Sequence, residues 1–321
     1  MKRLIILALI FVSFEYLYAQ SSSDGLLLKE YGFSRTRENG IHYYKMQTDV
    51  INISPDGKKT TRDVYTLYLA VSLNDGKGDK YDITCKKFFV NLKSGGIKAL
   101  PGLNDWKYSF NKTSDSRNEK GEVFGINHDK FENLKDENGN EIPVESSYLI
   151  YNSFIDFHAL MNAFSEKSPG GKGIQNLKKI GDRVVHDASY SQPPVNLGKR
   201  VKEGSYFKNG EIVLSFKGLS VVNGNPAAIV NYDSGESSFY MKTMATDKID
   251  AETNGRSHYL GDIYINISSL WPVKVELSEF VVSETKIISP PIEIHASVER
   301  TVVINEISKE EYENNSPRWI Y

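Results

Sequence analysis

The sequence predicts a mainly β protein in which antiparallel meanders form one or more curved sheets around a single central amphipathic helix. Three observations predict this fold. Apolar and polar residues alternate with a period of two over much of the chain, which is typical of antiparallel strands with one solvent-exposed face. Asn-Gly and Asp-Gly pairs stand between these runs, where tight hairpins need positive φ angles. One segment near the middle instead repeats large apolar residues at helical spacing.

The N-terminal segment has the pattern of an export signal. Met1-Lys2-Arg3 is basic, and the largely apolar run over residues 4–14 is too short to span a bilayer core of about 30 Å. Ala19 suits a signal peptidase, so residues 1–19 are predicted to be a signal peptide and residues 20–321 the mature chain. The alternative is an uncleaved membrane anchor. No later run is apolar enough to cross a membrane, and we expect a periplasmic or secreted protein.

Composition narrows the class of protein. The chain has 321 residues, 40% of them apolar, and a formal net charge of −2, which argues against a nucleic-acid binder with a basic face. Its single cysteine, Cys85, excludes an intrachain disulfide and is interpreted as a small buried residue on a strand. A large exported chain without disulfides fits a bacterial envelope.

The first meander is predicted over about residues 25–145. Its strands are expected near 41–53, 60–73 and 80–92. Pro55-Asp56-Gly57 supplies the first turn. The polar segment 104–140 is expected to form long loops with one short element near 129–134.

The helical segment 146–181 is expected to join the two meanders. Ser153 is the predicted N-cap, Pro169-Gly170-Gly171 ends the first helix, and a short second helix is expected over 174–180. The large apolar residues of the first helix recur at helical spacing and so form a stripe along one side. Such a stripe faces a core by default, and the alternative is that it lines a ligand-binding site. The candidate ligand-binding residues on this helix are Phe154, Phe157, His158, Met161 and Phe164.

The second meander is predicted over about residues 182–308. Asn209-Gly210 and Asn223-Gly224 are its expected hairpin turns. The two meanders form either one domain or two closely packed units. The predicted strands lie near 205–220, 226–233, 237–244, 258–268, 272–283 and 292–306.

Local motifs for chemistry are missing from the sequence. It contains no His-Glu-x-x-His, no Gly-x-Ser-x-Gly and no paired-cysteine spacing. His186-Asp187 is the first choice for a catalytic pair, but neighbours on a strand point to opposite faces. The acidic loops Asp136–Glu141 and Asn74–Asp79 depart from the calcium-loop pattern at Glu141 and Lys77. We therefore predict no catalytic residues, no metal and no cofactor.

Several short stretches carry a resemblance. They are Tyr18-Ala19-Gln20, the helix 154–164, Ile180-Gly181-Asp182-Arg183, the 221–226 hairpin, and Gly261–Asn266 followed by Trp271-Pro272-Val273-Lys274. This plan resembles exported β-rich proteins of unknown function from Bacteroidota. At the level of fold it is also similar to the half-barrel carriers of lipoproteins and lipids. The resemblance implies a curved sheet around a helix, and no functional residue carries over from it.

Three functions follow as expectations. The leading one is an exported, non-enzymatic envelope protein that binds an apolar or amphipathic ligand, such as a lipid, along the aromatic helix. The alternative is a structural or interaction component of the envelope with a protein partner, which uses strand edges or a face rich in the chain's 19 tyrosines. The third is a hydrolase whose active-site residues are far apart in sequence. Nucleic acid is not an expected partner, and no transmembrane segment is expected after signal cleavage.

Overall fold

The computed structural model describes residues 29–73, 78–112, 122–168, 171–193, 201–246, 249–288 and 291–316. The predicted signal peptide lies outside these residues. So do Pro169 and Gly170 of the predicted helix stop and most of the Asn74–Asp79 loop. In the part of the chain that is described, no helix is both long enough and apolar enough to cross a membrane.

The described chain forms a twelve-stranded antiparallel sheet, which confirms the predicted fold class. Its strand order is β4-β3-β2-β1-β12-β11-β10-β9-β8-β6, with β5 beside β3 and β7 beside β9. The strands are β1 (Gly40–Ile53), β2 (Lys59–Leu73), β3 (Lys80–Asn91), β4 (Lys98–Ala99), β5 (Trp106–Asn111), β6 (Arg183–Val185), β7 (Tyr206–Lys208), β8 (Val213–Val222), β9 (Asn225–Thr246), β10 (Ile249–Asn266), β11 (Pro272–Ile287) and β12 (Ile292–Ile307).

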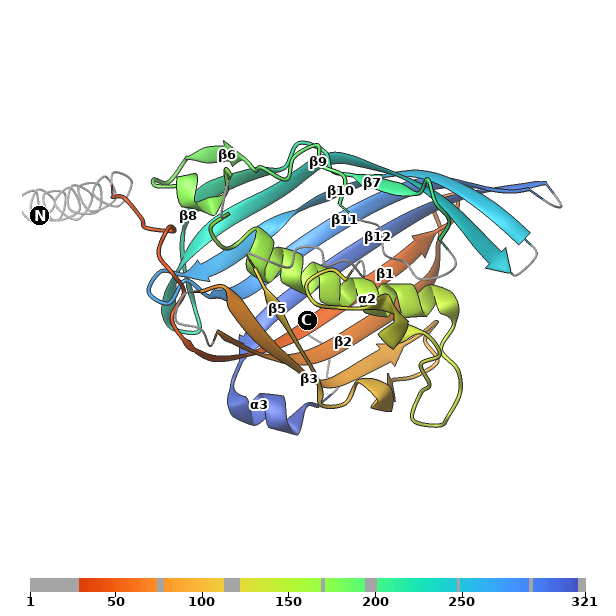
Figure 1. The fold of residues 1–321 in the computed structure, drawn as a ribbon, viewed down its shortest axis with the longest axis horizontal. Helices are drawn as coiled ribbons and strands as arrows, with labels where there is room; N and C mark the ends of the chain where they lie inside the picture. The colour runs from red at the N-terminus through yellow and green to blue at the C-terminus, as the bar shows by residue number, and fades with distance from the viewer. Residues whose placement is uncertain are drawn as a thin grey trace, which may run out of the picture.

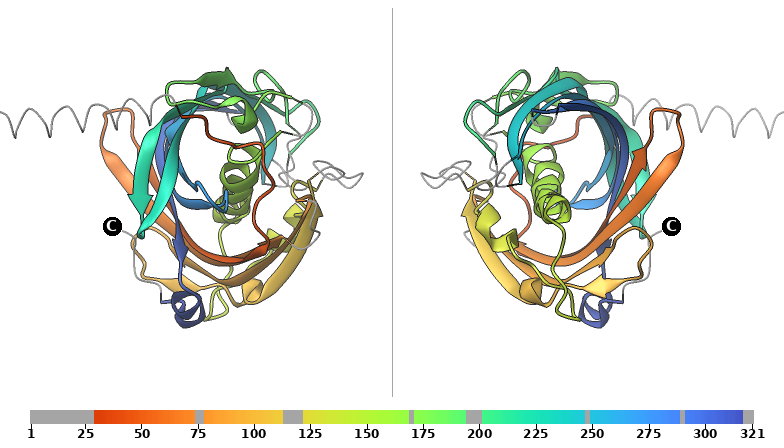
Figure 2. Two further views of the ribbon diagram at one scale, coloured as in Figure 1. Left: turned by 90° about the vertical axis from the view of Figure 1, so that its left-hand side faces the viewer. Right: turned by 90° about the vertical axis from the view of Figure 1, so that its right-hand side faces the viewer.

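The first and last long strands join the two meanders. β1 pairs with β2 on one side and with β12 on the other, in a register that runs from Tyr43 opposite Ile307 to Ile53 opposite Ser297. The resulting sheet curves around a helix, α2 (Val144–His158), as the end-on views of Figure 2 show. Within the described residues, no strand pairing joins the two ends of the sheet.

The central helix starts earlier than predicted. Its N-cap is Pro143, whose φ of −54° is close to the helical value, and a π-helical turn over Ala159–Ala163 extends its C-terminal end. The prediction that Ser153 caps the helix is wrong. Ser153 is buried inside the helix, and its Oγ donates to the carbonyl oxygen of Leu149 at 2.9 Å. Its hydroxyl therefore satisfies an earlier carbonyl instead of free N–H groups.

Two strands extend beyond their predicted limits. The predicted strands 226–233 and 237–244 form the single strand β9, because a bulge at Ser234-Gly235 carries the chain past the irregularity. Gly235 has φ +57°, which glycine adopts without strain. β10 begins at Ile249 rather than near 258, although residues 250–257 are mostly polar, because it is paired on both sides by β9 and β11.

Three shorter predictions are also corrected, and the short element expected near 129–134 is confirmed. Asn209-Gly210 does not close a hairpin, because β7 pairs with β9 and not with β8. Only a 3-10 turn over Ile174–Asn176 forms in the predicted second helix. β5 forms inside the predicted loop region, where Trp106, Tyr108 and Phe110 alternate with polar residues. The expected element near 129–134 is a 3-10 turn over His128–Phe131. A short C-terminal helix, α3 (Lys309–Asn314), was not predicted.

The core lies between α2 and the inner face of the sheet, which is the face toward the helix (Figure 1). Phe154 and Phe157 are fully buried. The Phe157 ring meets that of Tyr44 from β1, and the Phe154 ring meets that of Phe88 from β3, each with centroids 5.7 Å apart. Contacts between aromatic rings add to the stabilisation that burial provides.

Gly261 allows β10 and β11 to approach closely. A Cβ atom at Gly261 would lie 2.0 Å from the backbone oxygen of Glu276 and 2.7 Å from Cα of Leu277. Because these are backbone atoms of a paired strand, Gly261→Ala is expected to lower the free energy of unfolding by about 1–3 kcal/mol. Gly218→Ala in β8 is the control, since a Cβ there meets nothing within 4 Å. Urea unfolding measures both, and equal stabilities of the two variants would contradict the expectation.

Candidate functional site

The inner face of β9–β12 continues beyond the residues that contact α2. Figure 1 shows these strand ends extending past the helix. Strand register places the residues of this surface side by side in rows, such as Ser257–Val281–Val298 and Thr253–Thr285–Ile294. We call the following set the distal inner face: Ser237, Phe239, Met241, Ala251, Thr253, Gly255, Ser257, Val281, Ser283, Thr285, Ile287, Ile292, Ile294, Ala296 and Val298.

The distal inner face is built from apolar, small and hydroxyl residues, whereas the charges of these strand ends, beyond Glu279 and Arg300, lie on the opposite, outer face. On that outer face, Arg256 pairs with Glu236, Lys286 with Glu284 and His295 with Glu293. Ligand atoms of Glu284, Glu293 and His295 lie within 4.8 Å of one another, but they belong to this exposed ion-pair network. In these strand ends the charged side chains therefore all point to the outer face, with a period of two.

Several apolar groups of the distal inner face are accessible. Ile292 is 48% exposed and Ile294 is 46% exposed. Phe239 is partly buried, and its ring covers Gly255, where a Cβ atom would lie 2.1 Å from Phe239 Cζ. The Thr253 and Thr285 hydroxyls form a hydrogen bond of 2.8 Å with each other, so these polar groups are satisfied without a charged partner.

A buried charge cluster lies where the distal inner face meets α2. Arg300 of β12 donates from Nε to Glu279 Oε2 of β11 at 2.5 Å and from Nη1 to Asp156 Oδ2 of α2 at 2.5 Å. It also donates from Nη2 to Tyr259 Oη of β10 at 3.3 Å. Arg300 and Glu279 are buried, and Tyr259 is half-buried. One guanidinium thus joins the helix to three strands.

The charges of this cluster do not balance. Two carboxylates, Asp156 and Glu279, share the single positive charge of Arg300. Burial raises the pKa of Asp156 to about 6, an effect that Arg300 opposes and Glu279 reinforces. The titratable and charged groups that face Asp156 are Arg300, Glu279, Tyr259, Tyr148 and Tyr232.

Ser257 adds an unsatisfied hydroxyl beside the cluster. It precedes Tyr259 by two residues on β10, so both side chains lie on the inner face. Its side chain is buried, the residue being 4% exposed, and its Oγ has no hydrogen-bond partner. An unmade hydrogen bond at a buried hydroxyl costs about 1–3 kcal/mol.

A second buried cluster lies just beyond the first, around the π-helical turn that follows α2. Glu166 Oε2 accepts from Tyr81 Oη at 2.6 Å and pairs with Lys112 at 3.2 Å and with Arg37 at 3.8 Å. Arg37 also donates to Asn162 Oδ1 at 3.1 Å. Because that oxygen is an acceptor, the Asn162 amide nitrogen donates to His158 Nδ1, 3.0 Å away. His158 Nε2 therefore carries the proton and donates to Tyr108 Oη at 2.6 Å.

The ligand residues predicted from sequence lie on one helix, in its π-helical extension and, for Phe164, directly after that extension. Phe154, Phe157, His158 and Met161 are at most 1% exposed, and burial lowers the pKa of His158 to about 3. Phe164 is partly buried, with its ring 4.5 Å from that of Tyr232. These residues pack the helix onto the sheet, and ligand binding by them stays a prediction. The distal inner face was not predicted as a site, although the alternation of 272–283 and 292–306 contains part of it.

His186 and Asp187 come closer than strand geometry predicts, because they follow the end of β6. Asp187 Oδ1 lies 3.0 Å from His186 Nδ1, and Ser168 Oγ donates to Asp187 Oδ2 at 2.5 Å. The hydroxyl contacts the carboxylate and not the imidazole, so the imidazole does not activate it as a nucleophile. In the loop considered for calcium, Asp136 accepts from the backbone N–H groups of Asn138 and Asn140. It also pairs with Lys98 at 3.0 Å, so its carboxylate is used in the turn.

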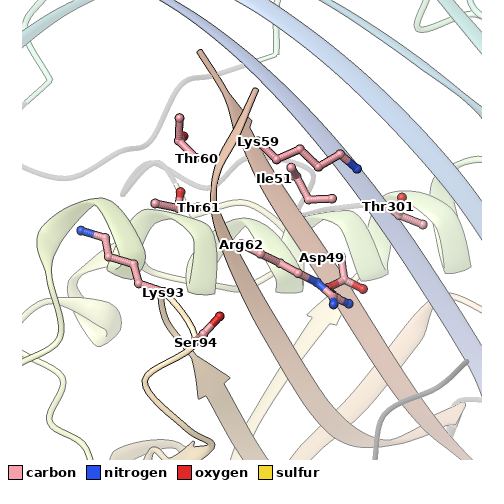
Figure 3. A pocket seen from close by; sticks show the side chains of 9 residues that line it. All are labelled: Asp49, Ile51, Lys59, Thr60, Thr61, Arg62, Lys93, Ser94 and Thr301. Atoms are coloured by element: carbon pink, nitrogen blue, oxygen red, sulfur yellow. Dashed lines mark hydrogen bonds and ion pairs between the residues drawn. The ribbon is translucent and has the colours of Figure 1, made fainter. Parts of the chain in front are cut away.

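The outer face carries a hollow of about 540 Å³ near the β1–β2 hairpin (Figure 3). Arg62 Nε donates to Asp49 Oδ1 at 2.9 Å, and Lys59 pairs with Glu299 at 3.8 Å. Because these cations are already paired, the hollow does not present a free charge at these positions. Its lining residues are Asp49, Ile51, Lys59, Thr60, Thr61, Arg62, Lys93, Ser94 and Thr301.

Comparisons with known proteins show no family. No family model matches the chain, and no curated protein matches it. OmpF of Salmonella typhi, solved with daunomycin, aligns at 6% identity and a TM-score of 0.21 over 84% of this chain and 98% of that chain. A domain of an outer membrane lipoprotein-sorting protein from Vibrio parahaemolyticus aligns at 9% identity and a TM-score of 0.15, over 85% of this chain and 90% of that chain. OmpT of Vibrio cholerae aligns at 10% identity and a TM-score of 0.24, over 84% of this chain and 99% of that chain. Similarities this low carry no functional argument.

The raised pKa of Asp156 predicts a pH effect on stability. Its carboxyl binds a proton more tightly in the folded chain than at its ordinary pKa of 3.8, so stability is lost as the pH rises from about 4 to about 6. Relative to Asp156→Asn, the wild-type free energy of unfolding should fall by about 3 kcal/mol over that window. Urea unfolding at several pH values measures it.

Glu284→Gln is the control for this experiment. The Lys286 ammonium lowers the pKa of Glu284, so its carboxylate favours the folded chain as the pH rises, which is the opposite sign. A pH-independent difference between wild type and Asp156→Asn would contradict the prediction.

Proposed function

We propose that this chain is an exported, non-enzymatic protein that binds a small amphiphile with a single apolar chain on its distal inner face. The observation that carries the proposal is the accessible, uncharged surface on the inner side of β9–β12, with Ile292 and Ile294 about half exposed. The basic and apolar N-terminal pattern at residues 1–19 supports export.

The dimensions and chemistry of the surface suit one chain. Six residues of β10 separate Ser257 from Ala251, which corresponds to about 20 Å along the strand. Covering the exposed half of an isoleucine side chain contributes about 1 kcal/mol, so binding requires several such contacts in line. The inner-face rows provide them between the charge cluster and Ile292.

The aromatic helix has a supporting role in this proposal. Phe154, Phe157, His158 and Met161 fix α2 against the sheet, so that the rows beyond it stay open. Phe164 is the partly accessible member of the predicted stripe. A ligand bound along the helix instead would contact Phe164 and leave Ile294 untouched.

A second candidate function is protein interaction at the outer face. Leu260, Phe280 and Val282 are 40%, 51% and 56% exposed there, on the neighbouring strands β10 and β11. Exposed apolar patches of this kind occur at protein interfaces. The patch belongs to the opposite face of the sheet, so the two functions can be tested separately.

The experiment compares two aspartate variants at equally accessible positions. Ile294→Asp places a charge on the distal inner face, and Val282→Asp places one on the outer face. Binding of an uncharged fluorescent probe with a dodecyl chain is measured by titration. We expect saturable binding that Ile294→Asp weakens about tenfold or more, because a carboxylate against an alkyl chain loses its water.

Val282→Asp should leave probe binding within about twofold of wild type. Circular dichroism checks that both variants keep their strands. If Val282→Asp weakens probe binding as much as Ile294→Asp does, or if no probe binds saturably, the proposal is wrong. Loss of a co-purifying protein in Val282→Asp alone would instead favour the interaction function.

A further inference from the structure

We infer that the polar end of this amphiphile is a cation, an ammonium group that binds beside Asp156, Glu279 and Ser257 at the base of the distal inner face. This inference rests on the proposed function and assigns the head group that the site accepts. It is carried by an unbalanced buried charge and by an unpartnered buried hydroxyl two residues from Tyr259 on the same inner face.

The charge cluster has one carboxylate more than it has cations. Arg300 bonds both Asp156 and Glu279, which leaves a formal charge of −1 in the cluster. A buried uncompensated charge is unfavourable, so a group that brings one positive charge is stabilised there. The Asp156 side chain is 12% exposed and Tyr259 is half-buried, so part of the cluster is accessible to solvent.

Ser257 supplies an acceptor that nothing in the described chain uses. Its Oγ is without a partner, and the residue is 4% exposed. An ammonium group has three N–H donors and no acceptor. A carboxylate oxygen of Glu279 and the Ser257 hydroxyl, which lie on the inner face of the neighbouring strands β11 and β10, are matched to two of these donors.

An anionic head group does not fit the same position. The Arg300 guanidinium is already bonded to two carboxylates and to Tyr259 Oη. An anion would have to displace one of these carboxylates, and both would repel it. A neutral head group would leave the excess charge in place.

The position of the cluster also orients the ligand. Glu279, Val281 and Ser283 follow one another on the inner face of β11, and Val298 and Ala296 lie beside the last two on β12. With the ammonium group at the cluster, the apolar chain would run along these residues toward Ile294. Head and chain therefore use adjoining parts of one surface.

The experiment titrates the protein with three twelve-carbon amphiphiles near neutral pH, each below its micelle concentration. They are dodecylammonium, dodecyl sulfate and the uncharged dodecyl maltoside. We expect dodecylammonium to bind at least about tenfold more tightly than the other two. In Glu279→Gln, which removes the excess charge, this advantage should fall to about threefold or less, with maltoside binding unchanged.

Two further variants test the ammonium site. Glu284→Gln removes a carboxylate from the outer face of the same strand and should keep the full preference, which excludes general attraction to the protein's charge. Ser257→Ala should weaken the binding of dodecylammonium about threefold and leave the binding of dodecyl maltoside unchanged. Circular dichroism shows which variants keep their strands, and Ser257→Ala decides the question if Glu279→Gln does not fold.

The failures can be told apart. Equal affinities for the three amphiphiles, or tighter binding of the sulfate, would overturn the inference while Ile294→Asp still showed that the chain binds on the distal inner face. A preference that Glu279→Gln and Ser257→Ala leave intact would overturn it as well. If none of the amphiphiles and no uncharged probe binds saturably, the proposed function fails together with the inference.

Discussion

The structure depends on the pairing of β1 with β12. This register, from Tyr43–Ile307 to Ile53–Ser297, joins strands that lie at opposite ends of the described chain. It turns two meanders into one curved sheet with a single inner face. Because that face is shared, α2 buries aromatic side chains against both halves at once, with Phe154 on Phe88 of β3 and Phe164 on Tyr232 of β9.

Buried charges then fix where α2 lies along the sheet. Arg300 connects its last turn to β10, β11 and β12 through Asp156, while Arg37 donates to Asn162 and to the Met161 carbonyl in the π-helical turn that follows. Such pairs add little net stability after desolvation, but a displaced helix would leave each charge unpartnered. The helix therefore has one favoured position, and the uncharged rows beyond it stay uncovered.

Sequence patterns predicted what is local. Alternation and Asp-Gly or Asn-Gly turns located β1, β2, β3, β11 and β12 within a few residues, because one face of each is buried. The start of α2 was missed, since Ser153 bonds Leu149 instead of capping. The first half of β10 was missed because its pairing, and not its own pattern, holds it. The distal inner face has no local signal of function: Ile294 resembles a core residue until the position of α2 leaves it exposed.

The long strands are consequently unequal along their length. Near Leu277 and Val302 the sheet is backed by the buried core, whereas near Ile287 and Ile292 it is a hydrogen-bonded ribbon with water on its inner side. Amide hydrogens of one strand thus belong to two cooperative units, one that opens with global unfolding and one that opens locally at lower free energy. A ligand on the ribbon would add the missing layer and bring the weaker unit closer to the stability of the stronger.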